Sequence, residues 1–280
     1  MKQKTAEGSD LDLEHWKDYL PELITESLWL LGARDRSGPH MGDYHGNFVP
    51  QIPYQVIRRF TKPGEVILDL FSGMGTTLIE CRHTGRHGIG VELNPNVVQH
   101  SQLRIDEAIN DACVTTRVLL GDSTRAETVS NIRTALSDLG ATHAHHVILH
   151  PPYWDIIGFS QSPDDLSCAP TKPAFLEGFG QVVDTAMSLL APERFLTLVI
   201  GDKYSKGEWV PLGFECMQTC LSKGLRLKAI NVKDIQGNEK GKGRTNNLWK
   251  YRALRHGFYI FKHEYVMLFR KPSHPRQPAV

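Results

Sequence analysis

Short apolar runs separated by turn residues recur along the chain. The clearest are Val66–Leu70, His87–Val91, Arg117–Leu120, His146–Leu149 and Phe195–Ile200. Runs of this length, bounded by glycine, proline and polar residues, are typical of buried strands in a parallel sheet. The stretches between them predict helices at Thr77–His83, Asn94–Asp111 and Thr128–Leu139. This alternation predicts an α/β fold with a doubly wound, mostly parallel sheet.

The two ends of the chain depart from this pattern. Residues 11–32 carry apolar positions at helical spacing, interrupted by Pro21, and a polar, glycine-containing loop follows them. We therefore expect residues 1–45 to form an N-terminal helical and loop segment, and 46–272 to form the main domain. The tail, 273–280, is predicted to be disordered.

Charge and cysteine content narrow the function classes. The 280 residues include 32 basic and 31 acidic ones, so any nucleic-acid surface must be local. The five cysteines are scattered and lack the spacing of a metal site, which predicts reduced thiols in a cytoplasmic protein without a metal. The N-terminus lacks an apolar signal region and no run approaches membrane-spanning length, so no membrane contact is expected.

The first candidate site follows the strand at Val66–Leu70. Asp69 is followed by the turn Phe71-Ser72-Gly73-Met74-Gly75-Thr76, and the next strand ends in Glu92. Glycines let the chain turn sharply and let a ligand approach the backbone. In an open parallel sheet, ligands bind in the crevice at the carboxyl ends of the strands. The pattern therefore predicts a nucleoside site, although an ordinary glycine turn remains an alternative.

The residues around the turn indicate which nucleoside. Leu78 stands where a dinucleotide-binding turn has its third glycine, and no lysine follows as in a phosphate-binding loop. Acids before the turn and after the next strand suit a cofactor with a ribose and a positive charge, such as S-adenosylmethionine. Glu92 is expected to accept hydrogen bonds from the ribose hydroxyls. Asp122, at the end of the third strand, is expected to accept from the base amine, or else to cap a helix.

The second candidate site follows the strand at His146–Leu149. The chain continues as His150-Pro151-Pro152-Tyr153-Trp154. The prolines fix an extended backbone whose carbonyls are available to accept hydrogen bonds. With an aromatic face at Tyr153, this stretch predicts a pocket for a flat base that carries an amino group. A Pro-Pro turn with aromatic packing is the structural alternative.

Together the two stretches resemble the DNA amino-methyltransferases of restriction–modification systems, which methylate N4 of cytosine or N6 of adenine. Residues 69–75 match the family's D-x-F-x-G-x-G turn, and residues 151–153 match three of the four positions of [D/N/S]-P-P-[Y/F]. Residues 45–50 and 85–92 are similar to the segments that flank the turn in that family. The resemblance is dense over residues 40–160 and implies a Rossmann-like class I methyltransferase fold.

The resemblance also implies partners and site residues. It implies S-adenosylmethionine as the cofactor and double-stranded DNA as the substrate. The implied cofactor-binding residues are Phe48, Asp69, Phe71, Ser72, Gly73, Gly75, Thr76, Glu92 and Asp122. The implied catalytic residues are His150, Pro151, Pro152 and Tyr153, with the flipped target base stacked on Tyr153.

His150 stands where the family has Asp, Asn or Ser. A neutral imidazole has one acceptor nitrogen, so it can replace the family's acceptor for the target amine. It can also take the proton afterwards, because the usual pKa of histidine is about 6.5. Alternatively, His150 marks an inactive DNA-binding relative.

Several substrates remain open from the sequence. Carbon-5 methylation of cytosine is excluded, because that family's nucleophile is a cysteine after a proline and no cysteine here follows one. Trp154 after the pocket resembles members that methylate N4 of cytosine, which favours that target over N6 of adenine. RNA or the glutamine of a protein are further alternatives.

Two polar segments are predicted to contact DNA. The first, residues 33–46, supplies Arg34 and Arg36, with His40 and His45 as further candidates. The second, a flexible basic loop at 233–256, supplies Lys240, Lys242, Arg244, Lys250 and Arg252. Ordinary solvated loops are the alternative for both. The protein is expected to be a nucleoid-associated monomer or homodimer, with a cognate restriction enzyme as a further partner.

Overall fold

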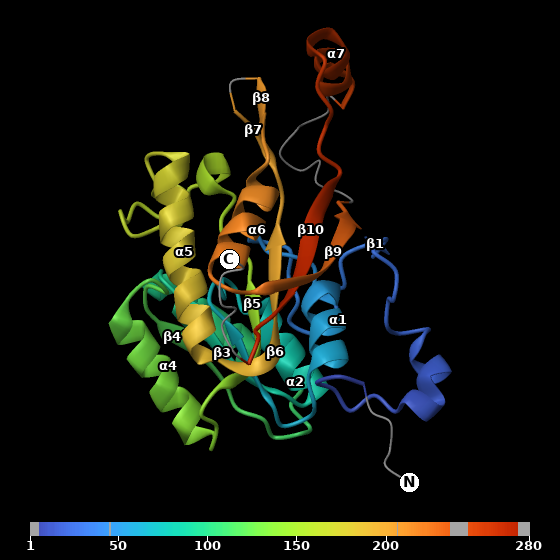
Figure 1. The fold of residues 1–280 in the computed structure, drawn as a ribbon, viewed down its shortest axis with the longest axis vertical. Helices are drawn as coiled ribbons and strands as arrows, with labels where there is room; N and C mark the ends of the chain where they lie inside the picture. The colour runs from blue at the N-terminus through green and yellow to red at the C-terminus, as the bar shows by residue number, and fades with distance from the viewer. Residues whose placement is uncertain (1–5, 45, 206, 236–245, 274–280) are drawn as a thin grey trace, which may run out of the picture.

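The computed structural model describes residues 6–44, 46–205, 207–235 and 246–273. Its centre is an eight-stranded sheet with the order β1-β9-β10-β6-β5-β2-β3-β4 (Figure 1). The strands are β1 Leu28–Trp29, β2 Val66–Asp69, β3 His87–Glu92, β4 Thr116–Leu120, β5 Ala144–Leu149, β6 Leu190–Ile200, β9 Arg226–Asp234 and β10 His263–Arg270. Within this sheet β10 runs antiparallel to β6 and β9, and the other pairs are parallel. The expected mostly parallel α/β sheet is confirmed.

Helices cover both faces of the sheet (Figure 1). They are α1 Gln51–Phe60, α2 Thr76–Thr84, α3 Pro95–Asp106, α4 Ala126–Asp138, α5 Lys172–Leu189 and α6 Leu212–Ser222. Side chains alternate between the faces of a strand. In β2, Leu68 therefore packs with α4, α5 and α6 on one face, whereas Ile67 packs with α1 on the other. Because the strands are apolar on both faces, they read as continuous hydrophobic runs in the sequence.

The sheet reverses its strand order beside β2. From β2 the chain proceeds through β3 to β4 on one side, whereas β5 pairs with β2 on the other side. The segments that follow β2 and β5 diverge, because α2 packs with α1 and α5 packs against the opposite face. A crevice opens where two such connections part, at the carboxyl ends of the strands.

The N-terminal segment differs from the predicted helix. It contains a 3₁₀ helix at Leu13–Tyr19 and the short strand β1, which pairs with β9. Trp29 in β1 is buried beside α1, but Leu13 and Trp16 are 43% and 49% exposed. The apolar residues of this segment do not form one helical face, because some pack beside α1 and others stay exposed.

The second half of the predicted basic loop is a helix, α7 Asn246–His256, which projects away from the body of the molecule (Figure 1). A hairpin of β7 Lys203–Ser205 and β8 Glu208–Val210 extends toward the same end (Figure 1). The rest of that predicted loop, 236–245, and the tail from 274 lie outside the described residues. Among the helices that the structure describes, none has both the length and the hydrophobicity that a membrane crossing requires.

Candidate active site

A cavity of about 550 Å³ lies at the carboxyl ends of β2, β3, β4 and β5. This volume is typical of a small-molecule site. The predicted residues that line it are Phe48, Phe71, Ser72, Gly73, Thr76, Glu92, Asp122, His150, Pro151, Pro152 and Tyr153. The two stretches singled out in the sequence therefore form walls of one cavity.

The turn after β2 depends on two glycines and on a third in the neighbouring strand. Gly73 and Gly75 have φ of 48° and 81°, which favour glycine. A Cβ on Gly75 would lie 2.6 Å from Ile105 Cδ1, and one on Gly90 would lie 2.4 Å from Ser72 Oγ. Because Gly90 has no Cβ, the turn can lie directly against β3. Gly90 was not among the predicted site residues, although it lies in the segment 85–92 that resembles the family's flanking segment.

Asp69 lies beneath the turn and is not among the cavity-lining residues. Its carboxylate accepts hydrogen bonds from Phe71 N at 2.9 Å and from Thr77 Oγ1 at 2.5 Å. Burial raises the pKa of Asp69 to about 6, although the two hydrogen bonds oppose this shift. Gly75 is also outside the lining. The structure thus gives Asp69 and Gly75 a supporting position, shaping the turn from below.

Glu92 reaches the cavity from the end of β3. Its two oxygens accept from the backbone N–H of Gly73 at 3.1 Å and of Asn94 at 2.8 Å. Burial raises its pKa, and the backbone bonds oppose this shift. Each carboxylate oxygen has a second lone pair, so Glu92 can also accept hydrogen bonds from ligand hydroxyls.

Asp122 stabilises the turn before α4 but does not cap that helix, whose N-cap is Arg125. Its carboxylate accepts from the backbone N–H and the hydroxyl of Thr124, each at 2.8 Å, and pairs with Arg125. It also lines the cavity, one strand further along than Glu92. It therefore stabilises its own turn and also forms part of the cavity wall.

His150 forms part of the opposite wall. Its ring meets Phe48 edge to face at 4.8 Å between centroids, and Tyr153 at 5.8 Å. Burial lowers the pKa of His150 to about 4, which Lys233 reinforces and Glu264 opposes. The imidazole is therefore neutral at pH 7 and retains one acceptor nitrogen.

A buried ion pair supports Tyr153. Its hydroxyl donates to Glu264 Oε2 at 2.8 Å, and Lys233 Nζ lies 2.9 Å from Glu264 Oε1. Lys233 and Glu264 are 6% and 8% exposed and face each other across β9 and β10. Burial, first of all, raises the pKa of Tyr153, and Glu264 adds to this shift. Both charged residues also line the cavity.

Sequence reasoning assigned Lys233 to the wrong element and missed Glu264. Lys233 was assigned to the basic loop, but it ends a strand inside the protein. Glu264 was not considered. The available signal for Glu264 was an acid directly before the buried apolar run 265–269, which is unusual unless the charge is paired. Lys233 gave no such signal, because β9 also carries Arg226 and Lys228.

Trp154 packs away from the cavity. Its indole N–H donates to the carbonyl of Ala169 at 2.9 Å, and Lys203 Nζ lies 4.4 Å from the ring centroid. Trp154 is not among the cavity-lining residues. It fixes the start of the loop that carries Ile157 and Phe159 over the cavity.

The predicted DNA contacts occupy different environments. Arg34 donates to the carbonyls of Met41, Asn47 and Phe48 at 2.9–3.2 Å, so it holds the loop beside the cavity. Arg36 is exposed on that loop, and Lys250 and Arg252 are exposed on α7. His40 is buried, which excludes it as a surface contact. His45, Lys240, Lys242 and Arg244 lie outside the described residues. The contacts assigned to the arginines and lysines stay predictions.

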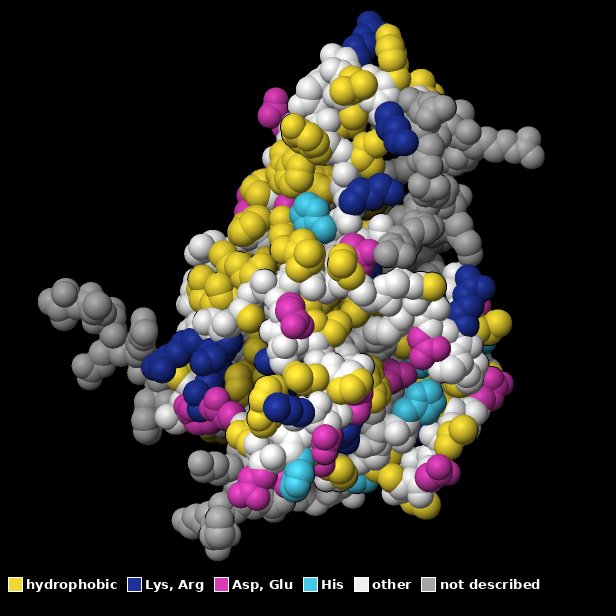
Figure 2. All heavy atoms as spheres, turned by 90° about the vertical axis from the view of Figure 1, so that its right-hand side faces the viewer, with side chains coloured by type: hydrophobic (Ala, Val, Ile, Leu, Met, Phe, Trp, Pro, Cys, Tyr) yellow, Lys and Arg dark blue, Asp and Glu magenta, His cyan; other side chains and the backbone are white. Residues whose placement is uncertain are grey.

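An aromatic cluster connects the projecting end to the cavity. The rings of Tyr204, Trp209 and Phe261 lie 4.4–5.3 Å apart between centroids. Phe261 also lines the cavity. Figure 2 shows apolar and basic side chains together along the projection. Its apolar residues include Tyr251, Leu254 and Tyr259, which are 57%, 87% and 80% exposed.

Comparison with known proteins finds a match for the glycine-turn side of the cavity. Residues 21–103, which include β2, the glycine turn and β3, match the sequence profile of a family described as DNA methylase. Over this segment the chain is similar to the DNA methylases. The resemblance expected from the two motifs is confirmed, and the match supports S-adenosylmethionine as the cofactor.

Curated relatives agree over part of their length. Type II methyltransferase M.MjaII from Methanocaldococcus jannaschii is 38% identical over 68 residues, which are 24% of this chain and 13% of the relative. M.BglI from Bacillus subtilis is 31% identical over 104 residues, 37% of this chain and 28% of the relative. The alignments thus span well under half of these relatives. Among solved structures, TrmN from Thermus thermophilus is similar in fold, with a TM-score of 0.50, 15% identity, and coverage of 80% of this chain and 49% of TrmN.

Proposed function

We propose that the protein is an S-adenosylmethionine-dependent DNA methyltransferase that methylates an exocyclic amine of a flipped base. The observation that carries this proposal is the single cavity shared by the glycine turn and the His150–Tyr153 wall. A methyl transfer between a cofactor and a base requires both to meet in one enclosed space. The family match over residues 21–103 supplies the reaction class.

The residues at the β2 and β3 side fit the cofactor. The carboxylates of Glu92 and Asp122 suit a molecule that carries hydroxyls, amines and a positive charge. The turn contains no lysine or arginine that could bind a phosphate. The backbone of Gly73 allows close approach because no side chain intervenes. When bound, S-adenosylmethionine supplies the methyl group on its sulfonium. Carboxylates near that charge favour binding by electrostatic attraction.

The residues at the β5 side fit the target base. His150 is neutral and accepts a hydrogen bond from one N–H of the base amine, while a carbonyl of the Pro151-Pro152 pair accepts from the other. The nitrogen lone pair would then be free to accept the methyl group that bound S-adenosylmethionine would supply. The nitrogen would release one proton, which His150 would relay to water rather than keep, because its pKa is lowered to about 4. Tyr153 provides the face on which the base rests.

We further propose that the target is N4 of cytosine in duplex DNA. The basis is Trp154 directly after Tyr153, which resembles members of the family that methylate this atom. Trp154 would act through the loop that it anchors, since it lies outside the cavity lining. The projection with α7 and the β7–β8 hairpin would contact the duplex beside the flipped base. Its basic and aromatic side chains, joined to the cavity through Phe261, support this placement.

The test uses purified protein, methyl-labelled S-adenosylmethionine and mixed-sequence duplex DNA. Digestion to nucleosides and mass spectrometry are expected to show labelled N4-methylcytosine, with turnover lost in His150→Ala and kept in the surface variant His100→Asn. Labelled N6-methyladenine would keep the reaction class and correct the base. Label that appears only with RNA or protein as substrate would overturn the DNA proposal, and cofactor binding without transfer would indicate an inactive relative.

A further inference from the structure

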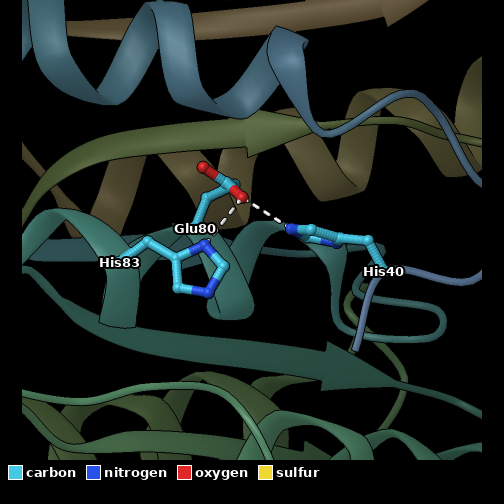
Figure 3. Close-up of side chains that lie close together, drawn as sticks. All are labelled: His40, Glu80 and His83. Atoms are coloured by element: carbon cyan, nitrogen blue, oxygen red, sulfur yellow. Dashed lines mark hydrogen bonds and ion pairs between the residues drawn. The ribbon is translucent and has the colours of Figure 1, made fainter. Parts of the chain in front are cut away.

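Three side chains outside the cavity converge between the N-terminal segment and α2: His40, Glu80 and His83 (Figure 3). Glu80 Oε1 lies 2.6 Å from His40 Nε2 and 3.2 Å from His83 Nδ1. The two imidazoles meet edge to face, with 5.7 Å between centroids. A single carboxylate oxygen thus faces a nitrogen from each ring.

The fold holds the three groups in place. Glu80 and His83 are three residues apart in α2, so they project from one face of the helix. His40 comes from the loop that precedes the cavity-lining residues Tyr44 and Phe48. The side chains of His40 and Glu80 are 0% and 5% exposed, whereas that of His83 is 24% exposed. The cluster is therefore enclosed on one side and open to solvent beside His83.

The chemistry of the cluster is that of a metal site. Two imidazole nitrogens and a carboxylate form a common ligand set for Zn²⁺ and related transition metals. One ligand atom from each residue lies within 4.8 Å of the other two, which spans the separation of ligands around a tetrahedral ion. Rotation of the Glu80 carboxylate about its soft terminal torsion would open the space between the nitrogens.

His40 gives a second, independent indication. Its Nδ1 is buried and has no hydrogen-bond partner in the described part of the chain. A fully buried imidazole therefore relies on Nε2 for its polar contact, and that nitrogen points into the cluster (Figure 3). Burying a polar ring costs free energy, and coordination of a metal ion by Nε2 would offset this cost more strongly than one hydrogen bond to a shared carboxylate.

We propose that His40, Glu80 and His83 bind one divalent transition-metal ion, with Zn²⁺ as the best match, and that water completes its coordination from the His83 side. The site lies apart from the cavity and does not depend on the proposed reaction. An ion there would tie the loop before Tyr44 to α2, the helix that begins at the glycine turn. Its role is therefore structural, holding two walls of the cavity together.

The experiment uses metal-stripped, tag-free full-length protein. Calorimetric titration with ZnCl₂ is expected to give one bound ion per chain, and MgCl₂ is expected to give none, because Mg²⁺ prefers oxygen ligands. His83→Ala removes a partly exposed ligand without opening the core, and is expected to weaken Zn²⁺ binding at least about tenfold. His100→Asn removes an exposed histidine on α3 and is expected to bind as the parent does.

Two further readouts separate the ion from a hydrogen-bonded cluster. The thermal midpoint of the parent is expected to rise with Zn²⁺, whereas His83→Ala and Glu80→Gln show little rise. Binding is expected to weaken as pH falls, because protons compete for the imidazoles. No saturable Zn²⁺ binding by the parent would overturn the proposal. Equal affinity in the parent, His83→Ala and His100→Asn would also overturn it, since the ion would then bind elsewhere.

Discussion

The Tyr153 hydroxyl donates to the carboxylate of Glu264 across 2.8 Å, which links residues 111 positions apart in the chain. Through this bond the aromatic wall of the cavity is fixed to β10, the last strand of the sheet. Glu264 in turn neutralises Lys233. The His150–Tyr153 wall of the cavity thus rests on a buried charge pair that neither sequence motif contains.

We predict that Glu264→Gln destabilises the protein by about 3–5 kcal/mol, because Lys233 is left buried without its counter-charge. Tyr153→Phe is expected to remove one hydrogen bond and cost about 1–2 kcal/mol. Urea unfolding measures both free energies. Glu208→Gln, at an exposed position of β8, is the control and is expected to change stability by less than about 0.5 kcal/mol. A Glu264→Gln effect as small as the control would show that the pair does not support the fold.

Acid is expected to destabilise the fold through His150. Its pKa in the folded protein is about 4, below the usual value of about 6.5, so the unfolded chain binds the proton more readily. The resulting stability is present above pH 6.5 and is lost as pH falls toward 4. We expect His150→Asn, which does not titrate, to lose about 1–3 kcal/mol less than the parent between pH 7 and pH 4.5.

The measurement is urea unfolding of both proteins at the two pH values. His146 also has a pKa lowered by burial, to about 3, but it is present in both proteins and cancels in the comparison. Equal losses in the parent and His150→Asn would contradict the assignment of a neutral, desolvated His150.

Gly90→Ala is expected to disrupt the glycine turn. The added Cβ would lie 2.4 Å from Ser72 Oγ and 2.8 Å from Ser72 Cβ, so the turn must move away from β3. We expect a loss of about 1–3 kcal/mol in stability and weaker binding of S-adenosylmethionine, measured by denaturation and calorimetry. Gly158→Ala meets nothing within 4 Å and serves as the matched control. Unchanged cofactor affinity in Gly90→Ala would separate this turn from the cofactor site.

Lys250 and Arg252 test the DNA surface. If each contacts a phosphate, Lys250→Ala and Arg252→Ala will weaken duplex binding for all sequences and each reduce the salt slope by about one. Fluorescence anisotropy over a range of salt concentrations measures both effects. Lys228→Ala, at an exposed lysine earlier in β9, is expected to leave the slope unchanged. An equal change in all three variants would indicate general charge rather than a binding surface.

The sequence predicted the parts of the protein that depend on local pattern. The runs at Val66 and His87 became β2 and β3 with nearly the expected limits, because parallel strands buried on both faces are continuously apolar. The glycine turn and the His150–Tyr153 stretch were found because turn chemistry and proline restrict the backbone locally. Both stretches reached the same cavity, as expected.

What the sequence did not predict depends on distant partners. Lys233 and Glu264 face each other only because of the register between β9 and β10, which no local pattern encodes. His40 resembled a surface residue in a polar loop until the fold brought it to Glu80. The helix α5 was not predicted, although Thr171 caps it and Pro173 stands in its first turn. Its exposed polar residues Glu177, Gln181 and Asp184 also follow helical spacing.

The reversal of strand order beside β2 has a consequence for how such a protein is encoded. The two walls of the cavity meet through the pairing of β2 with β5, and the chain between β4 and β5 passes through α4. The cavity therefore depends on the register between β2 and β5, and the length of chain that separates the two motifs does not decide whether their walls meet.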